Sequence, residues 1–464
     1  MSADWPIVTL KEAGIGLIDC DHKTPKEQDG GFPYVGIPQL RDGRIVLDGV
    51  KLISEEDFHH WRRKAKPLPN DVILSRRCNP GEIAYVPTNL DIALGQNLVL
   101  LRSDGVKVFP PFLRWITQGT NWWNQVKKYI NVGAIFDSLK CAEIPKFEFK
   151  LPPMDEQKRI SKILEDLDKK VEINHQTAQT LEQIAQTVFK SWFVDFEPTK
   201  AKVCAKENRQ DPGRAAMAIM SGKSLKELDL LCQEQQESLH ISASLFPESL
   251  MDSGLGEIPE GWAETPLYET AEYVNGGAFR AADFCESGEG LPIIKIAELK
   301  QGIYDGTKFT LKNVKERHFI TNDDVLYSWS GSPETSLEVF KWFGGDGWLN
   351  QHIFKLNFES QEKKYFTYYL LKHMKPVLIA TAQHKQTTGL GHITVADMKR
   401  LLVAYPSVEI LERFRELVGP IYDKCSIIEK ENIELISLRD TLLPKLLSGE
   451  LSLQEAEQNN KAIA

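Results

Sequence analysis

The chain contains an internal duplication, and this feature constrains its fold more than any other. The stretch FPYVGIPQLRDG at residues 32–43 is matched by LPIIKIAELKQG at 291–302, with the same alternation of apolar and polar residues. A proline, several aliphatic residues and the closing glycine coincide at a constant offset of 259 positions. A repeat of this length predicts two copies of one domain.

Each copy has the pattern of a mixed, strand-rich domain. Short runs of apolar and β-branched residues alternate with polar ones and are punctuated by glycine and proline, which is typical of an α+β fold. Helices are expected within 115–130 and 363–378. We assign the first copy to residues 1–150 and the second to 259–405.

A helical pattern follows each copy, in 151–196 and in 406–452. Apolar residues recur there at spacings of three and four, and each member of the first run has a counterpart 254 positions later. An amphipathic helix covering its own domain explains either run alone, but two matching, nearly continuous stripes favour helices that pack together along their length. The residues expected in this seam are Ile160, Ile163, Leu167, Val171, Leu181, Ile184, Val188, Phe414, Leu417, Ile421, Leu435, Leu438 and Leu442.

The predicted architecture is therefore domain, long helix, domain, long helix. We expect the two helices to be antiparallel and the halves to be related by a pseudo-twofold axis, like a symmetric dimer fused into one chain. Residues 197–258, rich in Lys, Glu, Gln and Ser, are expected to be a linker with a short helix at KSLKELDLL, and 453–464 a polar tail. About 34 helical residues give a spacer of about 50 Å, enough to hold two DNA-reading domains about one duplex turn apart.

The charge distribution is compatible with a nucleic-acid partner. The net charge of −9 arises mainly outside the repeats, because residues 1–150 carry 20 Lys and Arg against 18 Asp and Glu. The cluster WRRKAK, with Arg62, Arg63 and Lys64, is typical of phosphate contacts, although a solvated basic face is the alternative. The sequence alone does not distinguish phosphate contacts from a solvated basic face.

The composition indicates a soluble protein with several domains. Hydrophobic residues make up 42% of the chain and charged residues 26%. We expect a cytoplasmic protein, because the first residues do not resemble an export signal and no run of about 18 uncharged apolar residues occurs. Seven widely spaced cysteines without a CxxC pair are expected to be reduced thiols.

Three stretches resemble the specificity subunits of type I restriction-modification systems. They are PPMDEQKRISKILEDLDKKV at 152–171, SWFVDFEP at 191–198 and LFPESLMDSGLGEIPEGW at 245–262. The resemblance implies that each repeat is a target-recognition domain that reads one half of a split DNA sequence. It also implies that the paired helices set the distance between the halves.

The same resemblance implies a non-catalytic subunit that binds no cofactor itself. The expected partners are double-stranded DNA, two modification subunits that methylate adenine N6 with S-adenosylmethionine, and restriction subunits that translocate DNA with ATP and Mg²⁺. One departure concerns docking: the first helix opens with the family's Pro152, Pro153, Glu156 and Gln157, whereas the second opens with Tyr405, Pro406, Glu409 and Ile410. We therefore expect the start of the second helix to dock a partner differently.

Two other classes of function are alternatives. In a Mg²⁺-dependent nuclease, Asp283, Glu298 and Lys300 would hold the metal and activate water. The repeat argues against this role, since Glu298 and Lys300 fall on Gln39 and Arg41 in the first copy. A coiled-coil scaffold without DNA binding is the second alternative, and salt-dependent DNA binding would distinguish it.

Comparison of the two copies also suggests which residues contact DNA. Positions kept in both copies serve the shared fold, whereas polar positions that differ are candidates for reading different bases. SRRCNP at 75–80 aligns with SWSGSP at 328–333; arginine can bind guanine O6 and N7 with two donors, and asparagine can pair with adenine. With the basic cluster and two further polar loops, the candidate DNA contacts are Arg62, Arg63, Lys64, Arg76, Arg77, Asn79, Gln96, Asn97, Trp329, Ser330, Gln351, His352, His384, Lys385 and Gln386.

Overall fold

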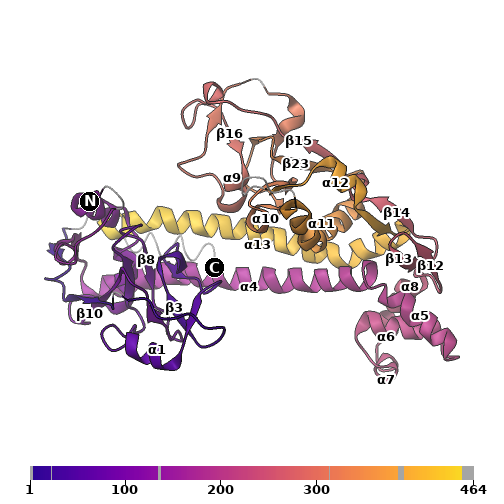
Figure 1. Cartoon of the computed structure of the whole chain (residues 1–464), viewed down its shortest axis with the longest axis horizontal. Helices are drawn as coiled ribbons and strands as arrows, with labels where there is room; N and C mark the ends of the chain where they lie inside the picture. Colours follow the sequence, from indigo (N-terminus) through magenta and orange to yellow (C-terminus); the bar gives the residue numbers. More distant parts are fainter. Residues whose placement is uncertain (1–3, 22, 134–136, 313, 385–390, 452–464) are drawn as a thin grey trace. The chain divides into compact units, whose positions relative to one another are not determined.

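The computed structural model describes residues 4–21, 23–133, 137–312, 314–384 and 391–451 (Figure 1). The chain divides into two compact units, one formed by Met1–Ile173 with Ile433–Ala464 and the other by Asn174–Asn432. The division falls within both long helices, α4 (Met154–Phe193) and α13 (Val408–Ser448). Each unit therefore contains one domain and one part of each helix. Among the described residues, no helix has the length and apolar character needed to cross a membrane.

The domain of the first unit is built on two small sheets. One is antiparallel with strand order β2-β10-β7-β8, and the other has the order β6-β3-β9, with β3 parallel to β9. A ladder of β1 with β11 joins the two ends of the domain. The bounds are β1 Ile7–Thr9, β2 Ile15–Asp19, β3 Phe32–Val35, β4 Leu40–Arg41, β5 Arg44–Ile45, β6 Lys51–Ile53, α1 Glu55–Trp61, β7 Val72–Ser75, β8 Ile83–Tyr85, β9 Ala93–Leu94, β10 Leu98–Ser103, α2 Leu113–Ile116, α3 Thr120–Tyr129 and β11 Glu148–Lys150.

The domain of the second unit repeats this topology. Its antiparallel sheet has the order β15-β23-β19-β21, and its second sheet the order β17-β16-β22-β18, with β16 parallel to β22. The ladder of β14 with β25 corresponds to that of β1 with β11. The bounds are β14 Ala263–Pro266, β15 Glu272–Asn275, β16 Leu291–Ile294, α9 Ile296–Gln301, β17 Phe309–Thr310, β18 Phe319–Ile320, β19 Val325–Ser328, β20 Ser330–Gly331, α10 Pro333–Ser336, β21 Glu338–Lys341, β22 Gly347–Leu349, β23 Ile353–Asn357, α11 Gln361–Gln383, β24 Gly391–His392, α12 Val395–Arg400 and β25 Leu402–Tyr405. The predicted α+β duplication is confirmed.

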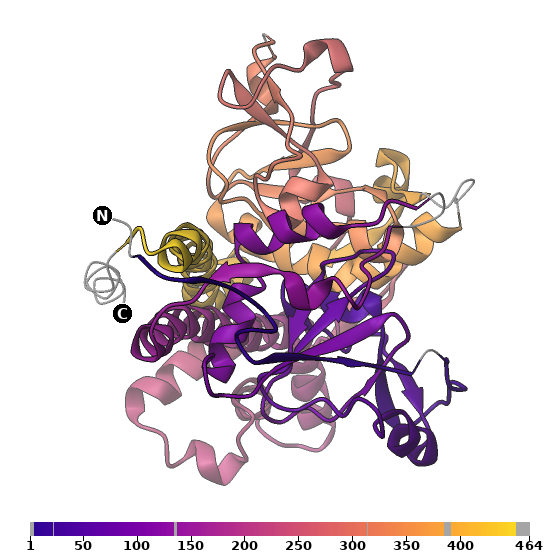
Figure 2. The same ribbon diagram turned by 90° about the vertical axis from the view of Figure 1, so that its left-hand side faces the viewer.

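In the first unit, the start of α4 packs against the end of α13 and against the sheet domain. The two helix segments lie side by side next to the domain in both views (Figures 1 and 2). The segments run in opposite directions, as predicted. One core contains residues from all three parts: Ile160, Ile163, Leu167 and Val171 from α4, Leu435, Leu442 and Leu446 from α13, and Val72, Leu101, Phe112 and Trp115 from the domain.

In the second unit, the end of α4 and the start of α13 share an aromatic core with α11. Phe193 lies 5.0 Å from Phe414 of α13 and 5.1 Å from Phe366 of α11, as measured between ring centroids. Phe189 lies 5.6 Å from the Phe366 ring and 6.0 Å from the Phe414 ring. Edge-to-face contacts of this kind contribute beyond the burial of area alone.

The predicted helix seam needs correction at two positions. Ile184 and Leu417 are 48% and 42% exposed, and the following residues, Ala185 and Val418, are buried instead. Because an α-helix has 3.6 residues per turn, its buried face moves slowly around the helix relative to a strict seven-residue repeat. A row of apolar positions that is predicted from spacing alone can therefore be wrong by one residue part of the way along the helix. The remaining predicted seam residues are buried or half-buried.

The expectation that the two helix starts dock a partner differently stays a prediction, and the structure shows how the residues that distinguish the two starts are placed. Gln157 is fully buried, and its amide donates to Lys107 O at 2.9 Å and to Pro152 O at 2.8 Å. Its Oε1 atom accepts a hydrogen bond from Phe109 N at 2.8 Å. At the offset of 254 positions that relates the two helices, the counterpart of Gln157 is Leu411, which like Ile410 is 1% exposed. The difference between the two helices therefore lies in how each start packs on its own domain.

Residues 197–258, predicted to be a linker, are largely folded. Helices α5 (Glu197–Glu207), α6 (Pro212–Ser221), α7 (Leu225–Leu228) and α8 (Gln233–Ser244) precede a hairpin of β12 (Leu250–Ser253) and β13 (Gly256–Pro259). Ala216, Met217, Leu228 and Ala243 form a small buried cluster. The polar composition concealed these few apolar positions. The Arg413 guanidinium of α13 anchors α8 by donating to Ser242 Oγ at 2.6 Å and Ser238 O at 3.0 Å.

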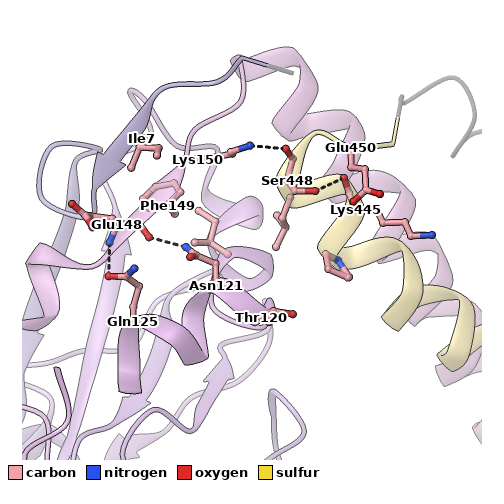
Figure 3. Close-up of a pocket in the computed structure, with 13 residues that line it drawn as sticks. Ile7, Thr120, Asn121, Gln125, Glu148, Phe149, Lys150, Lys445, Ser448 and Glu450 are labelled. Atoms are coloured by element: carbon pink, nitrogen blue, oxygen red, sulfur yellow. Dashed lines mark hydrogen bonds between the residues drawn. The ribbon is translucent and has the colours of Figure 1, made fainter. Parts of the chain in front are cut away.

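A cavity of about 640 Å³ lies where the first domain meets the end of α13 (Figure 3). On the domain side, Asn121 Nδ2 donates to Glu148 O at 2.7 Å, and Glu148 N donates to Gln125 Oε1 at 3.1 Å. Lys150 Nζ reaches across to Ser448 O at 3.0 Å. The cavity is part of the junction between domain and helix.

The second core yields a stability prediction. Phe414→Ala removes a fully buried ring and should lower the free energy of unfolding by about 3–5 kcal/mol. Leu417→Ala, on the same helix, should cost less than about 1 kcal/mol because Leu417 is 42% exposed, whereas Phe414 is fully buried. Urea denaturation of both variants measures the difference. Equal losses would contradict the assignment of the seam.

Candidate nucleic-acid interface

The structure brings the main candidate residues of each copy together at one pair of turns. In the first unit Ser75, at the end of β7, pairs with Leu98, at the start of β10, and Arg76 N donates to Asn97 O at 3.0 Å. In the second unit Ser328 pairs with Ile353, and Trp329 N donates to His352 O at 3.3 Å. The two domains thus have the same local frame, from which different side chains extend.

In the first unit, hydrogen bonds within the turn and to α3 fix its shape. Ser75 Oγ donates to Arg77 O at 2.9 Å, and Gly81 N donates to Ser75 O at 2.9 Å. Gly81 has a φ of 100°, and a Cβ there would clash with Val126. Trp122 Nε1 donates to Gly81 O at 2.9 Å. The turn is therefore held against the domain while its tip points outward.

The residues at the tip of the turn differ in their exposure. Arg77, Cys78 and Asn79 are exposed. The side chain of Arg76 is only 12% exposed, and its Nε atom lies 4.0 Å from Asp19 Oδ1. Of the two adjacent arginines, Arg77 is therefore better placed for an external contact.

The residues of the basic cluster, Arg62, Arg63 and Lys64, also differ in their exposure. Arg62 donates to Asp91 Oδ1 at 2.7 Å and lies 4.4 Å from the centre of the Phe58 ring, with its side chain 10% exposed. It therefore serves the fold. Arg63 is exposed, and Lys64 Nζ lies 4.0 Å from Asp19 Oδ2.

Asp19 connects the two basic segments and was not predicted from the sequence. Its two carboxylate oxygens lie 4.0 Å from Arg76 and 4.0 Å from Lys64, which are 12 positions apart in the chain. An acidic residue at the end of β2 has no distinctive pattern. Only the pairing of β2 with β10 shows that it lies next to both cations.

The second turn of the first unit rests on a buried tyrosine. Tyr34, 6% exposed, accepts a hydrogen bond from Gln96 N and donates to Lys23 O, both at 3.2 Å. Gln96 is exposed, while Asn97 is half-buried with a φ of 71° and supplies the carbonyl that binds Arg76 N. Gln96 is therefore the residue of this pair that extends outward.

In the second unit, the tryptophan turn is anchored by Asn275. The half-buried Trp329 ring donates from Nε1 to Asn275 Oδ1 at 3.2 Å and lies 5.7 Å from the His352 ring. Gln351 and His352 are exposed and lie together, with 3.3 Å between Gln351 Nε2 and His352 Nε2. Burial lowers the pKa of nearby His318, whose Nδ1 atom lies 2.8 Å from Asn275 O.

The remaining candidates lie beside this turn or outside the described residues. Ser330, in β20, pairs with His392 in β24 and is half-buried. His384 caps the end of α11 and is exposed. Lys385 and Gln386 lie outside the described residues.

The residues of the nuclease alternative serve as local structural contacts. Glu298 is 2% exposed, and Oε2 accepts a hydrogen bond from Lys295 N at 2.9 Å at the start of α9. Asp283 Oδ2 accepts hydrogen bonds from Lys312 Nζ and Arg280 N, each at 2.8 Å. No group of three His, Cys, Asp or Glu residues in the described parts of the chain is arranged to hold a metal ion.

Comparison with known proteins finds the duplication again, with each match covering one domain and most of the long helix that follows it. The family model described as "Type I restriction modification DNA specificity domain" matches residues 3–183 and again 259–437. Helices α5 to α8 lie between the two matches. The two matched segments make up most of the chain.

Relatives match over nearly their whole length. The chain is 25% identical over 437 residues to the type I restriction enzyme HindI specificity subunit of Haemophilus influenzae, covering 88% of this chain and 94% of that protein. It is 24% identical over 456 residues to the MjaIX specificity subunit of Methanocaldococcus jannaschii, covering 97% and 94%. The crystal structure of a type I restriction-modification system S subunit from M. genitalium aligns over 96% of both chains, with a TM-score of 0.48 and 15% identity.

The duplicated α+β domains with their paired turns define a protein with two related recognition domains. Since the family model matches both copies, the chain belongs to the family of type I restriction modification DNA specificity domains. The resemblance seen in the sequence is confirmed.

The thiol of Cys78 can be used to test whether the turn in the first unit contacts DNA. Cys78 is exposed between Arg77 and Asn79, and duplex DNA should slow its alkylation by a maleimide several-fold. Exposed Cys204 and Cys232, in the region of α5 to α8, should react equally with or without DNA. Burial raises the pKa of Cys20 to about 11, so this thiol should stay unmodified. Mass spectrometry after a short pulse measures all four, and unprotected Cys78 would contradict the location.

Proposed function

We propose that this chain is the DNA-reading specificity subunit of a type I restriction-modification complex, with each domain contacting one half of a split target. One observation carries the proposal: equivalent turns in the two domains, held by equivalent backbone bonds, present different polar side chains. Arg77, Asn79 and Gln96 extend from the first pair of turns, and Gln351 and His352 from the second. The family to which the chain belongs, described as a DNA specificity domain, supports this reading of the turns.

Recognition of two different half-sites follows from this difference. Arginine donates to two acceptors of guanine, whereas glutamine and asparagine pair with adenine in the major groove. Neighbouring cations such as Arg63 and Lys64 would add phosphate contacts that orient the domain without reading sequence.

Methyl transfer and DNA cleavage are assigned in this proposal to partner subunits. Modification subunits would use S-adenosylmethionine, and restriction subunits ATP and Mg²⁺, while this chain binds none of these cofactors. Protein partners would dock on the long helices, and the exposed aliphatic side chains there are candidates for contacting them. These are Ile173 and Ile184 on α4, and Leu417, Ile427 and Ile433 on α13, each at least 42% exposed.

The helix pair would set the gap between the half-sites. Helix α4 has 40 residues, which corresponds to about 60 Å at 1.5 Å per residue. Its pairing with α13 continues up to the boundary between the units, where Asn174 Nδ2 donates to Asn432 Oδ1 at 3.0 Å and Glu431 Oε2 at 2.7 Å.

A matched pair of substitutions tests the assignment of one domain to one half-site. Arg77→Ala should weaken discrimination at one base pair of one half-site by about 1–3 kcal/mol if it makes a bidentate base contact. Gln351→Ala should act only on the other half-site. Adenine methylation by the complex with modification subunits, mapped across a genome, measures both. Effects of both substitutions on the same half-site would refute the assignment.

A paired deletion tests the role of the helices. Removing residues 174–180 from α4 together with 426–432 from α13 keeps the two helices in step and removes the polar contact at Asn174. Seven residues correspond to about 10 Å, or about three base pairs. The same half-sites should then be methylated with a gap about three base pairs shorter. An unchanged gap would show that the helices do not set it.

A further inference from the structure

A buried carboxylate of α4 joins all three parts of the first unit. Asp168 is 6% exposed. Its Oδ2 atom accepts a hydrogen bond from Arg114 of α2, and its Oδ1 atom accepts one from Arg439 of α13 at 2.9 Å. One side chain thus contacts the domain and the partner helix at once.

The geometry around Arg114 makes this contact directional. Its guanidinium carbon lies 3.9 Å from the centre of the Tyr85 ring and 4.1 Å from that of Trp115, and its side chain is 11% exposed. A planar guanidinium held by two rings can reach a carboxylate from few directions. Arg44 of the same domain lies 3.8 Å from Asp168 Oδ2, so a third cation approaches the carboxylate.

The second unit has aromatic and small side chains at the positions that correspond to the three ions. The residues 254 positions after Arg114 and Asp168 are Tyr368 and Tyr422, whose rings lie 5.0 Å apart at 89°. The position 254 residues before Arg439 is Ala185, which is fully buried. Lysines surround the two rings: Lys341 of β21 lies 4.6 Å and Lys364 of α11 lies 5.3 Å from the centre of the Tyr422 ring, and Lys372 of α11 lies 5.5 Å from that of Tyr368.

The difference between the two units shows that packing at this junction can be achieved with other side chains. The repeat preserves the meeting point of domain, α4 and α13, but not the residues there, so the fold itself does not demand a carboxylate held between two arginines. Replacing a buried ion pair by apolar residues often leaves stability unchanged or improves it. Directional bonds between ions instead select one arrangement among several that apolar contacts would permit.

We propose that Asp168 is a positioning residue for DNA recognition: with Arg114 and Arg439 it fixes the orientation of the first domain on the helix pair. This orientation sets the spacing and helical phase at which the first half-site is presented. The inference rests on the proposed function. Asp168 acts through the domain and does not touch DNA.

The test measures how strongly methylation depends on the length of the gap when the sequences of the two half-sites are kept the same. Asp168→Asn retains the size of the side chain and removes its charge. The complex with modification subunits should still methylate the same bases, but its preference for the native gap over gaps one base pair longer or shorter should fall about tenfold. Asp166→Asn is the matched control, because Asp166 forms a more exposed pair with Lys162 on the same helix at 3.0 Å and should leave the preference unchanged.

A second variant covers the case in which Asp168→Asn does not fold. The triple substitution Arg114→Met, Asp168→Leu and Arg439→Met fills the junction with apolar side chains and should assemble with the same relaxed gap preference. A strict gap in both variants would overturn the inference, and so would failure of both to assemble, because the cluster would then serve stability. A wild-type complex that methylates no split target would instead contradict the proposed function, and the inference with it.

Discussion

The packing of α4 against α13, with a sheet domain on the same core, is the interaction on which each unit depends. The sheets are small, and strands of two to six residues do not form a stable domain without a large apolar partner. The helices supply that partner. In the first unit aliphatic side chains such as Ile160 and Leu442 complete the core, and in the second unit Phe189 and Phe414 do so.

Duplication explains how one scaffold supports two recognition surfaces. The strand order and the ladder from Ser75 to Leu98 recur as that from Ser328 to Ile353. An ion pair also recurs, since Arg102 binds Asp71 at 2.7 Å and Lys355 binds Asp324 at 2.9 Å. Features that shape the domain are thus kept, while the residues at the exposed turns differ. This division is expected if the turns carry specificity and the remainder carries the fold.

The sequence was sufficient to predict the duplication, the fold class and the long helices. All three depend on periodicity, which is visible along the chain. Periodicity gave wrong results where a difference of one residue decides which side chain is buried. The spacing of apolar residues placed Ile184 and Leu417 in the seam, although both are exposed. It also described residues 197–258 as a linker, because the few apolar residues that build their small core are dispersed among polar ones.

The sequence indicated which loops form the candidate site, but not which of their side chains are exposed or which residues they contact. Arg62 and Arg77 look equally suitable in the sequence, yet Arg62 is held by Asp91 while Arg77 is exposed. The partners of Asp168 are 54 and 271 positions away, so no local pattern reveals them. One signal was available: Asp168 is a charged residue at a helix position where the second copy has an aromatic one.

The most direct test of the account is the sequence motif methylated by the intact complex. Genome-wide mapping of methylated adenines in cells that express this chain with its modification subunits would reveal it. If each domain reads one half of the target, the motif consists of two short specified segments of different sequence, separated by an unspecified gap of fixed length. A single continuous motif would contradict the claim that the two domains read separate halves of the target.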